Sequence, residues 1–411
     1  MKKFRLISLI IAVVMVVSML FIFAACDKEP DLEGIAATIA EGEGMTTAQL
    51  LEKAKEEKGV FTAYGTSSRI ADAVKNFIKK YPELGLNADT SVGVKKNDSE
   101  IYTLIMNEYM ATNNANAASM VMPQDGAQLV LYRESTTFLQ NYVPSTMKDK
   151  MGDNELVPLV HQYINKLFIW NKTGSGADIS ITNVWQLVDS TFMQGRTIFF
   201  KNPAGEQVNN NFLIMLTKKE WSDKIAAAYK AYYNKDIALD SDCPNAGYQW
   251  VKQFLKQVNF SINSDSTICT DLNKDTNAGN MGLFVLSKMR SLTTNNLQVA
   301  AWKEVESKLV EVNPFAGFMY PMYCQVTSKA PRPYTAMLFI NYLMEEEGFE
   351  PWADWGAYST NPDVAIQEGD KELSFWRNCL VIEDSAYIGS VKATVTDFIN
   401  KIVDANPTVK K

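Results

Sequence analysis

The chain has 411 residues, of which 46% are apolar and 21% charged, and its formal net charge at pH 7 is −7. These values are typical of a globular protein of about two domains and exclude disordered, collagen-like and low-complexity chains. The acidic balance argues against a nucleic-acid partner. His161 is the single histidine and the five cysteines form no C-x-x-C pair, so we expect no metal, no cofactor and no histidine-based catalysis.

The first 30 residues have the pattern of a secretory signal. Three positive charges in the first five residues precede an uncharged apolar run over residues 6–25. An uncleaved membrane anchor is the alternative, since such a run can cross a bilayer. The run ends in Phe23-Ala24-Ala25-Cys26, which resembles the bacterial lipobox, whose cysteine is diacylated. We therefore predict a signal peptide over residues 1–25, lipidation at Cys26 and a lipid tether over residues 26–45.

Four cysteines remain after that cleavage. Outside the cytoplasm they allow one or two disulfides, in three possible pairings, or they stay as buried free thiols. The sequence leaves both open for Cys243, Cys269, Cys324 and Cys379.

Strands and helices alternate in the first part of the body. Residues 60–64, 91–94 and 119–122 have the composition of short buried strands. Between the first two, Ile70, Val74 and Phe77 recur at helical spacing after a turn rich in hydroxyl side chains. Residues 97–99 predict the cap of a second helix. This βαβαβ order predicts a parallel sheet covered by helices.

A second unit is predicted to start after residues 167–171. It contains a loop over 172–176, a short helix around Trp185 and strands at 197–200 and 282–286. Helices are expected at about 210–216, 219–233 and 244–257, and the chain returns through residues 314–326. Two helices, at about 333–346 and 391–403, end the chain.

Several segments together resemble the extracellular solute-binding proteins of bacterial ABC importers, in the two-lobed class that includes the ferric-binding proteins. The resemblance covers about residues 50–405 and rests on Tyr64-Gly65-Thr66-Ser67-Ser68-Arg69, Pro123-Gln124-Asp125-Gly126, Asn183-Val184-Trp185-Gln186-Leu187, Phe315-Ala316-Gly317-Phe318-Met319-Tyr320-Pro321, and Ala336-Met337-Leu338-Phe339-Ile340 leading to Glu347-Gly348-Phe349.

The resemblance implies an α/β, two-lobed, type II periplasmic-binding-protein-like fold with a hinge between the lobes. We expect lobe 1 to comprise residues 46–170 plus about 310–411, and lobe 2 to comprise residues 171–309. The implied function is capture of a small solute by a monomeric, lipid-anchored extracytoplasmic protein that delivers it to an ABC permease. Ligands of such sheets bind beyond the carboxyl ends of the strands, where helix N-termini point inward.

The candidate ligand-binding residues follow predicted strands or open predicted helices, and each has a structural alternative. Thr66, Ser67 and Ser68 either bind a polar or anionic ligand or only cap a helix. Arg69 either pairs with a ligand anion or is solvated. Further candidates are Gln124, Asp125, Trp185, Asn211, Lys288, Arg290 and Tyr320, whose alternatives are turn, cap and core roles.

The positions of the tyrosines indicate whether the protein could coordinate ferric iron. Ferric-binding relatives use adjacent tyrosines after an apolar strand of the second lobe, because phenolate is a hard oxygen ligand. The matching strand at 282–286 is followed by Lys288 and Arg290 instead. We therefore expect an anionic solute, and ferric iron is the alternative.

Three other functions stay open. A neutral sugar stacked on Trp185 and Tyr320 is one, and a sensory lipoprotein of the same fold is another. A secreted hydrolase is the third, disfavoured because the chain has no G-x-S-x-G motif and His161 has apolar neighbours.

Overall fold

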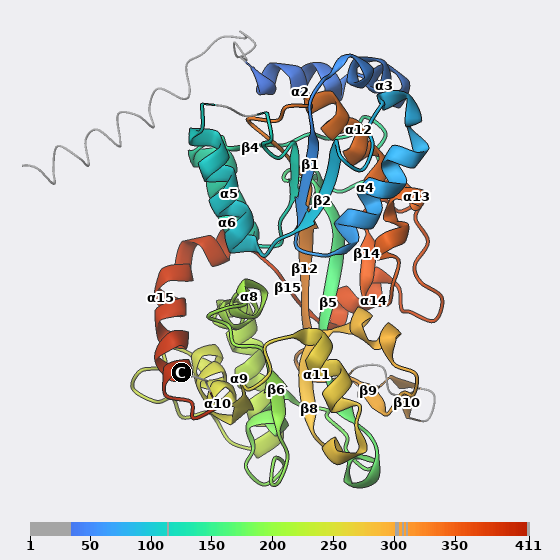
Figure 1. Ribbon diagram of the computed structural model, residues 1–411. Coiled ribbons are helices and arrows are strands. Elements are labelled where there is room, and N and C mark those ends of the chain that lie inside the picture. The colour runs from blue at the N-terminus through green and yellow to red at the C-terminus, as the bar shows by residue number, and fades with distance from the viewer. Residues whose placement is uncertain (1–33, 113–114, 301–303, 306–307, 310, 409–411) are drawn as a thin grey trace, which may run out of the picture.

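The computed structural model describes residues 34–112, 115–300, 304–305, 308–309 and 311–408. It has two lobes, one above the other in Figure 1, and each is built on a sheet flanked by helices. The two-lobed α/β architecture that we predicted is therefore confirmed. The predicted signal peptide over residues 1–25 and the lipidation site Cys26 lie outside the described residues.

The first lobe contains a five-stranded sheet whose first three strands run parallel, as the βαβαβ pattern predicted. Its order is β2 (Ser91–Lys95), β1 (Phe61–Gly65), β3 (Met120–Met122), β13 (Gln325–Thr327) and β4 (Leu139–Gln140). The helices of this lobe are α2 (Ile35–Glu43), α3 (Thr47–Glu56), α4 (Arg69–Lys80), α5 (Asp98–Met110), α6 (Gly126–Val130), α12 (Pro333–Leu343) and α13 (Glu346–Phe349).

Helix α4 forms where the sequence predicted it, because its apolar positions fall on one face. Ile70, Val74 and Phe77 are buried on that face. The ring of Phe77 lies 4.9 Å from that of Phe339 in α12 and 6.0 Å from that of Phe61 in β1. Aromatic packing therefore joins the helix to the sheet and to the late helix α12.

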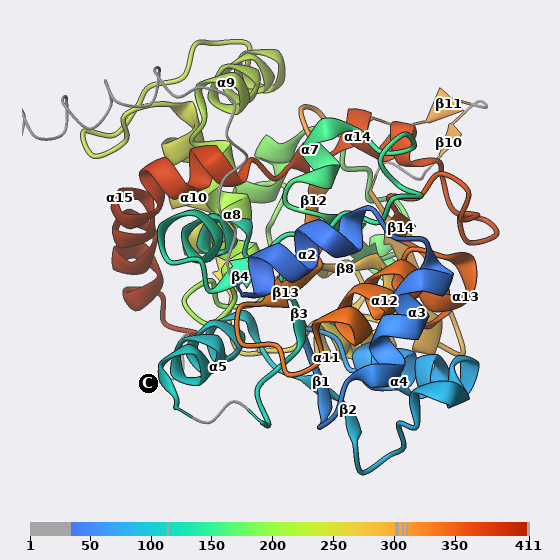
Figure 2. The ribbon, with the colours of Figure 1, turned by 90° about the horizontal axis from the view of Figure 1, so that it is seen from above.

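Helix α2 lies within residues 26–45, which we expected to be a tether. It packs beside α12 and β4, as the view from above shows (Figure 2). Ile39 is buried, and a Cβ on Gly42 would lie only 2.4 Å from the sulfur of Met337. Residues 35–43 are therefore part of the lobe, because one apolar side chain and one glycine fit them closely to α12.

The second lobe contains an eight-stranded sheet. Its order is β15 (Val381–Ile382), β12 (Gly317–Tyr323), β5 (Val160–Asn171), β8 (Met281–Val285), β6 (Ile198–Phe200) and β7 (Val258–Asn259), while β14 (Ala357–Ser359) and β9 (Leu297–Val299) also pair with β5. The helices around it are α8 (Gln207–Leu216), α9 (Lys219–Tyr233), α10 (Ala246–Gln257), α11 (Asp265–Leu272) and α15 (Ser385–Asp404). The remaining elements are α7 (Asp153–Leu156), α14 (Leu373–Cys379), and the strand pair β10 (Glu304–Val305) and β11 (Lys308–Leu309).

The core of the second lobe is also aromatic. Trp250 stacks on Phe254 with ring centroids 4.6 Å apart, and Phe168 of β5 packs edge-on against Phe254. Cys243, Cys269, Cys324 and Cys379 are free thiols, and the first three are buried. The free-thiol alternative is therefore the one that the structure shows.

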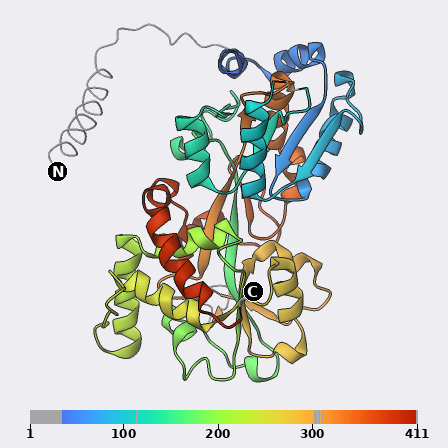
Figure 3. The ribbon, with the colours of Figure 1, turned by 60° about the vertical axis from the view of Figure 1, so that its left-hand side comes forward.

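Strands β5 and β12 run between the lobes, as Figures 1 and 3 show. They pair antiparallel from Gly317 opposite Leu167 to Tyr323 opposite Val160. The lower half of β5 pairs with β8, whereas β12 continues into β13 of the first sheet. These two strands connect the lobes, and they form the region about which a hinge would bend.

The C-terminal helix α15 differs from our expectation that residues 310–411 return to lobe 1. Its side chains bind helices of the second lobe: Asn210 donates to Thr396 at 2.9 Å, and the ring of Phe398 lies 5.0 Å from that of Tyr248. Beyond the helix, Asn406 donates to the Leu255 carbonyl oxygen at 2.9 Å. The helix starts at Ser385 rather than 391, because Asp384 accepts a capping bond from the Tyr387 N–H.

Candidate functional site

A cleft of about 650 Å³ lies between the lobes. Its walls are the loops that follow β1, β2 and β3 in the first lobe and β6, β7 and β8 in the second. Its floor includes Gln162 and Ile164 of β5 and Tyr320 and Met322 of β12. The carboxyl ends of the parallel strands in both sheets thus face one cavity, as expected for a ligand site of this kind of sheet.

Eight of the eleven residues that we predicted to bind ligand line this cleft. They are Thr66, Ser67, Ser68, Arg69, Gln124, Lys288, Arg290 and Tyr320. They come from both lobes and from a crossing strand, and the fold brings them together. Their contact with a solute stays a prediction.

The hydroxyl groups before α4 are only partly used within the chain. Ser68 occupies the N-cap position without a side-chain capping bond, and Ser67 Oγ accepts from the Arg69 N–H at 3.4 Å. The Thr66 hydroxyl oxygen is buried and has no hydrogen-bond partner among the described residues. Simple capping, the alternative that we considered, therefore leaves two of the three hydroxyls without a partner on the helix.

Arg69 and Arg290 share one carboxylate, which lies before β14. Arg69 pairs with Asp354 and donates to the Trp352 carbonyl oxygen at 3.2 Å, and Arg290 Nε lies 3.2 Å from Asp354 Oδ2. The Arg69 side chain is only 14% exposed, so the solvated alternative is wrong. Because Arg69 begins α4 and Arg290 follows β8, this bridge joins the two lobes at the cleft.

Unlike Arg69 and Arg290, which pair with Asp354, Lys288 makes no ion pair with a carboxylate among the described residues. No hydrogen bond or ion pair of its ammonium group is found within the described part of the chain, and the side chain is partly buried. Burial lowers the pKa of Lys288, and the nearby cations Arg290, Arg69 and Lys95 lower it further, while Asp265 opposes them. These cations form a basic wall, defined as Arg69, Lys95, Lys288 and Arg290, where a bound anion would relieve mutual repulsion.

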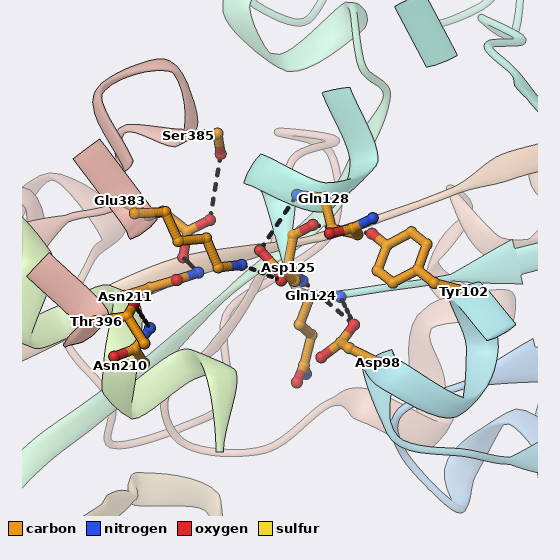
Figure 4. Close-up of polar contacts among 11 residues, drawn as sticks. Asp98, Tyr102, Gln124, Asp125, Gln128, Asn210, Asn211, Glu383, Ser385 and Thr396 are labelled. Atoms are coloured by element: carbon orange, nitrogen blue, oxygen red, sulfur yellow. Dashed lines mark hydrogen bonds and ion pairs between the residues drawn. The ribbon is translucent and has the colours of Figure 1, made fainter. Parts of the chain in front are cut away.

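Asp125 and Asn211 do not line the cleft; they belong to a buried polar cluster behind it (Figure 4). Asp125 caps α6 and pairs with Lys392 of α15 at 2.7 Å. Asn211 donates to Glu383 Oε2 at 3.3 Å. The structure thus places both away from the cleft, because each side chain is turned to a partner from the C-terminal segment that sequence spacing does not reveal.

Trp185 is also outside the cleft. Its side chain is fully buried in the second lobe, where the indole N–H donates to the Ile225 carbonyl oxygen at 2.9 Å and the ring packs edge-on against Tyr229. It therefore forms no aromatic wall for a ligand, and the core alternative is correct. His161 is buried too, with Nε2 3.1 Å from the Leu343 carbonyl oxygen, and burial lowers its pKa to about 4.

A second, acidic group of cleft residues was missed by the sequence analysis. Asp98 is the first residue of α5, Glu206 precedes α8 and Asp265 is the first residue of α11. Their positions read as helix starts, where acidic residues are common without any ligand. The strand before Asp265, β7, has two residues only, so no periodicity marks that loop as a strand end.

Lys166 holds two of these carboxylates from beneath. It lies on β5 and is 1% exposed, with Nζ 3.2 Å from Asp265 Oδ2 and 4.0 Å from Glu206 Oε1. It also donates to Asn209 Oδ1 at 2.7 Å. Lys201 pairs with Glu206 as well. Removing Lys166, or either of the carboxylates that it pairs with, would leave a buried charge uncompensated. The side chains of Lys166, Asp265 and Glu206 are therefore fixed in place.

No family model matches the chain, and no curated protein matches its sequence. Solved structures do match its fold. Iron-bound HitA from Pseudomonas aeruginosa has a TM-score of 0.60 at 12% identity, covering 84% of this chain and 99% of that one. The Trichodesmium protein IdiA (FutA) in complex with iron and citrate has a TM-score of 0.55 at 14% identity, with coverages of 84% and 99%.

A third structure is AgtB from A. tumefaciens R10 in complex with agropinic acid, with a TM-score of 0.54 at 13% identity and coverages of 84% and 99%. The chain has the type II periplasmic-binding-protein fold. Within this periplasmic-binding-protein fold, the cleft between the lobes is the place where the two sheets present their loops to a ligand. Among the described residues, no helix has the length and apolar character needed to cross a bilayer.

Proposed function

We propose that the protein is an extracytoplasmic solute-binding protein that captures a small anionic solute between its lobes and delivers it to an ABC permease. The observation that carries the proposal is the basic wall of the cleft, above all Lys288. This cation is partly buried beside Arg290 and Arg69 and makes no ion pair in the described part of the chain, although Asp265 is near enough to raise its pKa. A carboxylate or phosphonate group would supply the missing negative charge.

The surrounding hydrogen-bond donors support an anion as well. The hydroxyls of Thr66 and Ser68 line the cleft and make no hydrogen bond within the described part of the chain, so both can donate to a bound anion. A basic wall in the cleft of a protein of net charge −7 would also attract small anions to that part of the cleft. A sugar stacked on Trp185 and Tyr320 is not compatible with Trp185 in the core.

A thermal-shift screen of the mature protein against a solute library tests this function. A solute at 100 times its Kd adds about 2.7 kcal/mol of stability. Binding of an anion should weaken as ionic strength rises, whereas binding of a neutral solute should hardly change. Lys288→Gln should weaken binding at least tenfold, while Lys219→Gln, on an exposed helix face, should not. Salt-independent binding that tolerates Lys288→Gln would refute the anionic solute.

The N-terminal residues support the proposed location outside the cytoplasm. The pattern over residues 1–26 supports secretion and a diacyl anchor at Cys26, which would hold the protein beside its permease. Similar solved structures are described as a ferric binding protein and a periplasmic binding protein, which supports our proposal of binding without enzymatic turnover. Deletion of a neighbouring permease gene should abolish uptake of the solute; a sensory role would leave uptake intact.

Ferric iron is the second candidate, because two of the similar structures are described as holding iron. Asp98, Glu206, Asp265 and the Tyr320 hydroxyl are hard oxygen donors in one part of the cleft. Against this, burial raises the pKa of Tyr320, and Lys166 already holds two of the carboxylates. Tyr232 and Tyr233 lie at the end of α9, away from the cleft. Titration with ferric citrate should give no tyrosinate absorption band.

A further inference from the structure

The acidic residues of the cleft lie together around Tyr320. Burial raises the pKa of Tyr320, and the carboxylates of Asp265, Glu206 and Asp98 raise it further. Asp98, from the first lobe, is also affected by Glu206 from the second: burial raises its pKa to about 7, with Asp125 and Glu206 adding to the effect. The two lobes thus present an acidic wall, defined as Asp98, Glu206 and Asp265, to one end of the cavity.

The two walls of the cleft have opposite sign. In the acidic wall, Glu206 and Asp265 are matched by Lys166 and Lys201, but Asp98 has no cationic partner among the described residues and accepts only backbone N–H groups. In the basic wall, Arg69 and Arg290 share Asp354, and Lys95 and Lys288 add two cations that make no ion pair among the described residues. The cleft is therefore dipolar rather than uniformly positive.

Three buried acceptor atoms near the acidic wall have no partner in the described part of the chain. They are Asp265 Oδ1, Gln207 Oε1 and Gln162 Oε1. Gln162 is fully buried, lies in the cleft floor on β5 and pairs in register with Met322, two residues from Tyr320. Buried acceptors without a donor are unfavourable, so hydrogen-bond donors from a ligand would stabilise the bound state here. An ammonium group has three donors and no acceptor. Its positive charge would also give Asp98 the cationic partner that it does not have among the described residues.

We infer that the solute is dipolar, with an acidic group at the basic wall and an amino group at the acidic wall. This inference rests on the proposed solute-binding function and narrows its substrate class to amino acids and related amino-bearing acids. Each wall carries residues of both lobes, so a solute that contacts both walls would contact both lobes at two places. An acid without the amino group would leave the acceptors at Asp265 and Gln207 unpaired.

Matched pairs of acids test the inference. Calorimetric titration of the mature protein uses 4-aminobutyrate against butyrate, 6-aminohexanoate against hexanoate, and glutamate against glutarate. We expect at least one amino acid to bind at least tenfold more tightly than its partner without the amino group. Glu206→Gln should reduce that preference at least threefold, and Glu220→Gln, which makes the same charge change on exposed α9 of the same lobe, should leave it unchanged.

The outcomes separate this inference from the proposed function. Equal or tighter binding of the acids without an amino group overturns the dipolar solute and leaves the anionic solute standing. If none of the three pairs binds, the dipolar solute is overturned. If only neutral solutes bind, both the dipolar solute and the proposed capture of an anion are overturned. If Glu206→Gln does not fold, Gln207→Ala provides the same comparison, because it removes one unpaired acceptor without changing the charge.

Discussion

At the residue scale, the two serines before α4 give the sharpest test of the cleft. Ser67→Ala with Ser68→Ala removes two hydroxyl donors from the basic end of the cavity. If each bonds an anion, each contributes about 1.5–3 kcal/mol, so the double variant should bind at least tenfold more weakly in a titration. Its unfolding midpoint should stay close to that of the wild type, since Ser68 makes no capping bond and the only bond lost is the long one from the Arg69 N–H to Ser67 Oγ at 3.4 Å.

Ser390→Ala, at an exposed position of α15, is the control for this pair. It should change neither solute affinity nor stability. A double variant with unchanged affinity would show that the loop after β1 has a structural role only.

Glu383 predicts a pH dependence of stability. Burial raises its pKa to about 8, and the nearby Asp125 carboxylate adds to the shift. Between the unfolded value of 4.5 and about 8, the folded state binds more protons than the unfolded state, so this group lowers the free energy of unfolding as pH rises through that window. Glu383→Gln stays neutral and should flatten the decline in unfolding midpoint between pH 5 and 8.

The exposed Glu83→Gln is the matched control for that measurement and should retain the wild-type pH profile. Asp98, whose pKa is raised to about 7, contributes a decline of the same sign that remains in both variants. A Glu383→Gln profile identical to the wild type would contradict the assignment.

At the element scale, the C-terminal helix α15 joins the lobes. It packs against α8 and α10 of the second lobe and to a similar extent against α6 of the first lobe, where Lys392 pairs with Asp125. Lys392→Met would leave the buried Asp125 beside Asp98 and Glu383 without its cation. We expect a loss of about 1–3 kcal/mol in denaturant unfolding, reduced from the value for a fully buried pair because Lys392 is partly exposed.

Lys401→Met on the same helix is the matched control. Its partner Asp397 lies one turn away, and both side chains are more than 60% exposed. Exposed pairs of this kind contribute about 0–1 kcal/mol, so this variant should unfold close to the wild type. Equal losses in both variants would mean that helix propensity, rather than the contact between lobes, explains the effect.

At the scale of the whole molecule, the crossing strands β5 and β12 predict closure around the solute. Two lobes connected by few strands move as rigid bodies about the connection. Small-angle scattering should show a smaller radius of gyration when the solute is added, and the solute should be recovered chemically unchanged. Turnover of the solute would contradict a binding protein, and a constant radius would contradict hinge closure.

Lipidation is the second prediction at this scale. One acyl chain gives marginal membrane binding, and two give stable anchoring. Intact-mass analysis of protein extracted from membranes should show an N-terminus at a diacylated Cys26, and Cys26→Ser should release the protein from the membrane. A mass that begins at Met1 would favour the anchor-helix alternative.

The sequence by itself determined most elements of the fold. Helix α9 spans the predicted residues 219–233, and β1, β3, β6 and β8 lie at or within one residue of their predicted positions. Local patterns suffice here, because apolar spacing, caps and turns act within a few residues of one another. The loops after β1 and β8 were found for the same reason, since each follows a strand long enough to recognise.

Only the tertiary structure decided which polar residues face the cleft. Asp125 and Asn211 follow the same local rules as Gln124, yet their partners Lys392 and Glu383 come from more than 170 residues away. Lys166 directly precedes the apolar run at residues 167–170, and its burial is explained only by the ion pairs with Asp265 and Glu206. Burial and charge compensation depend on neighbours in space, and a single sequence carries no record of which distant residues become neighbours.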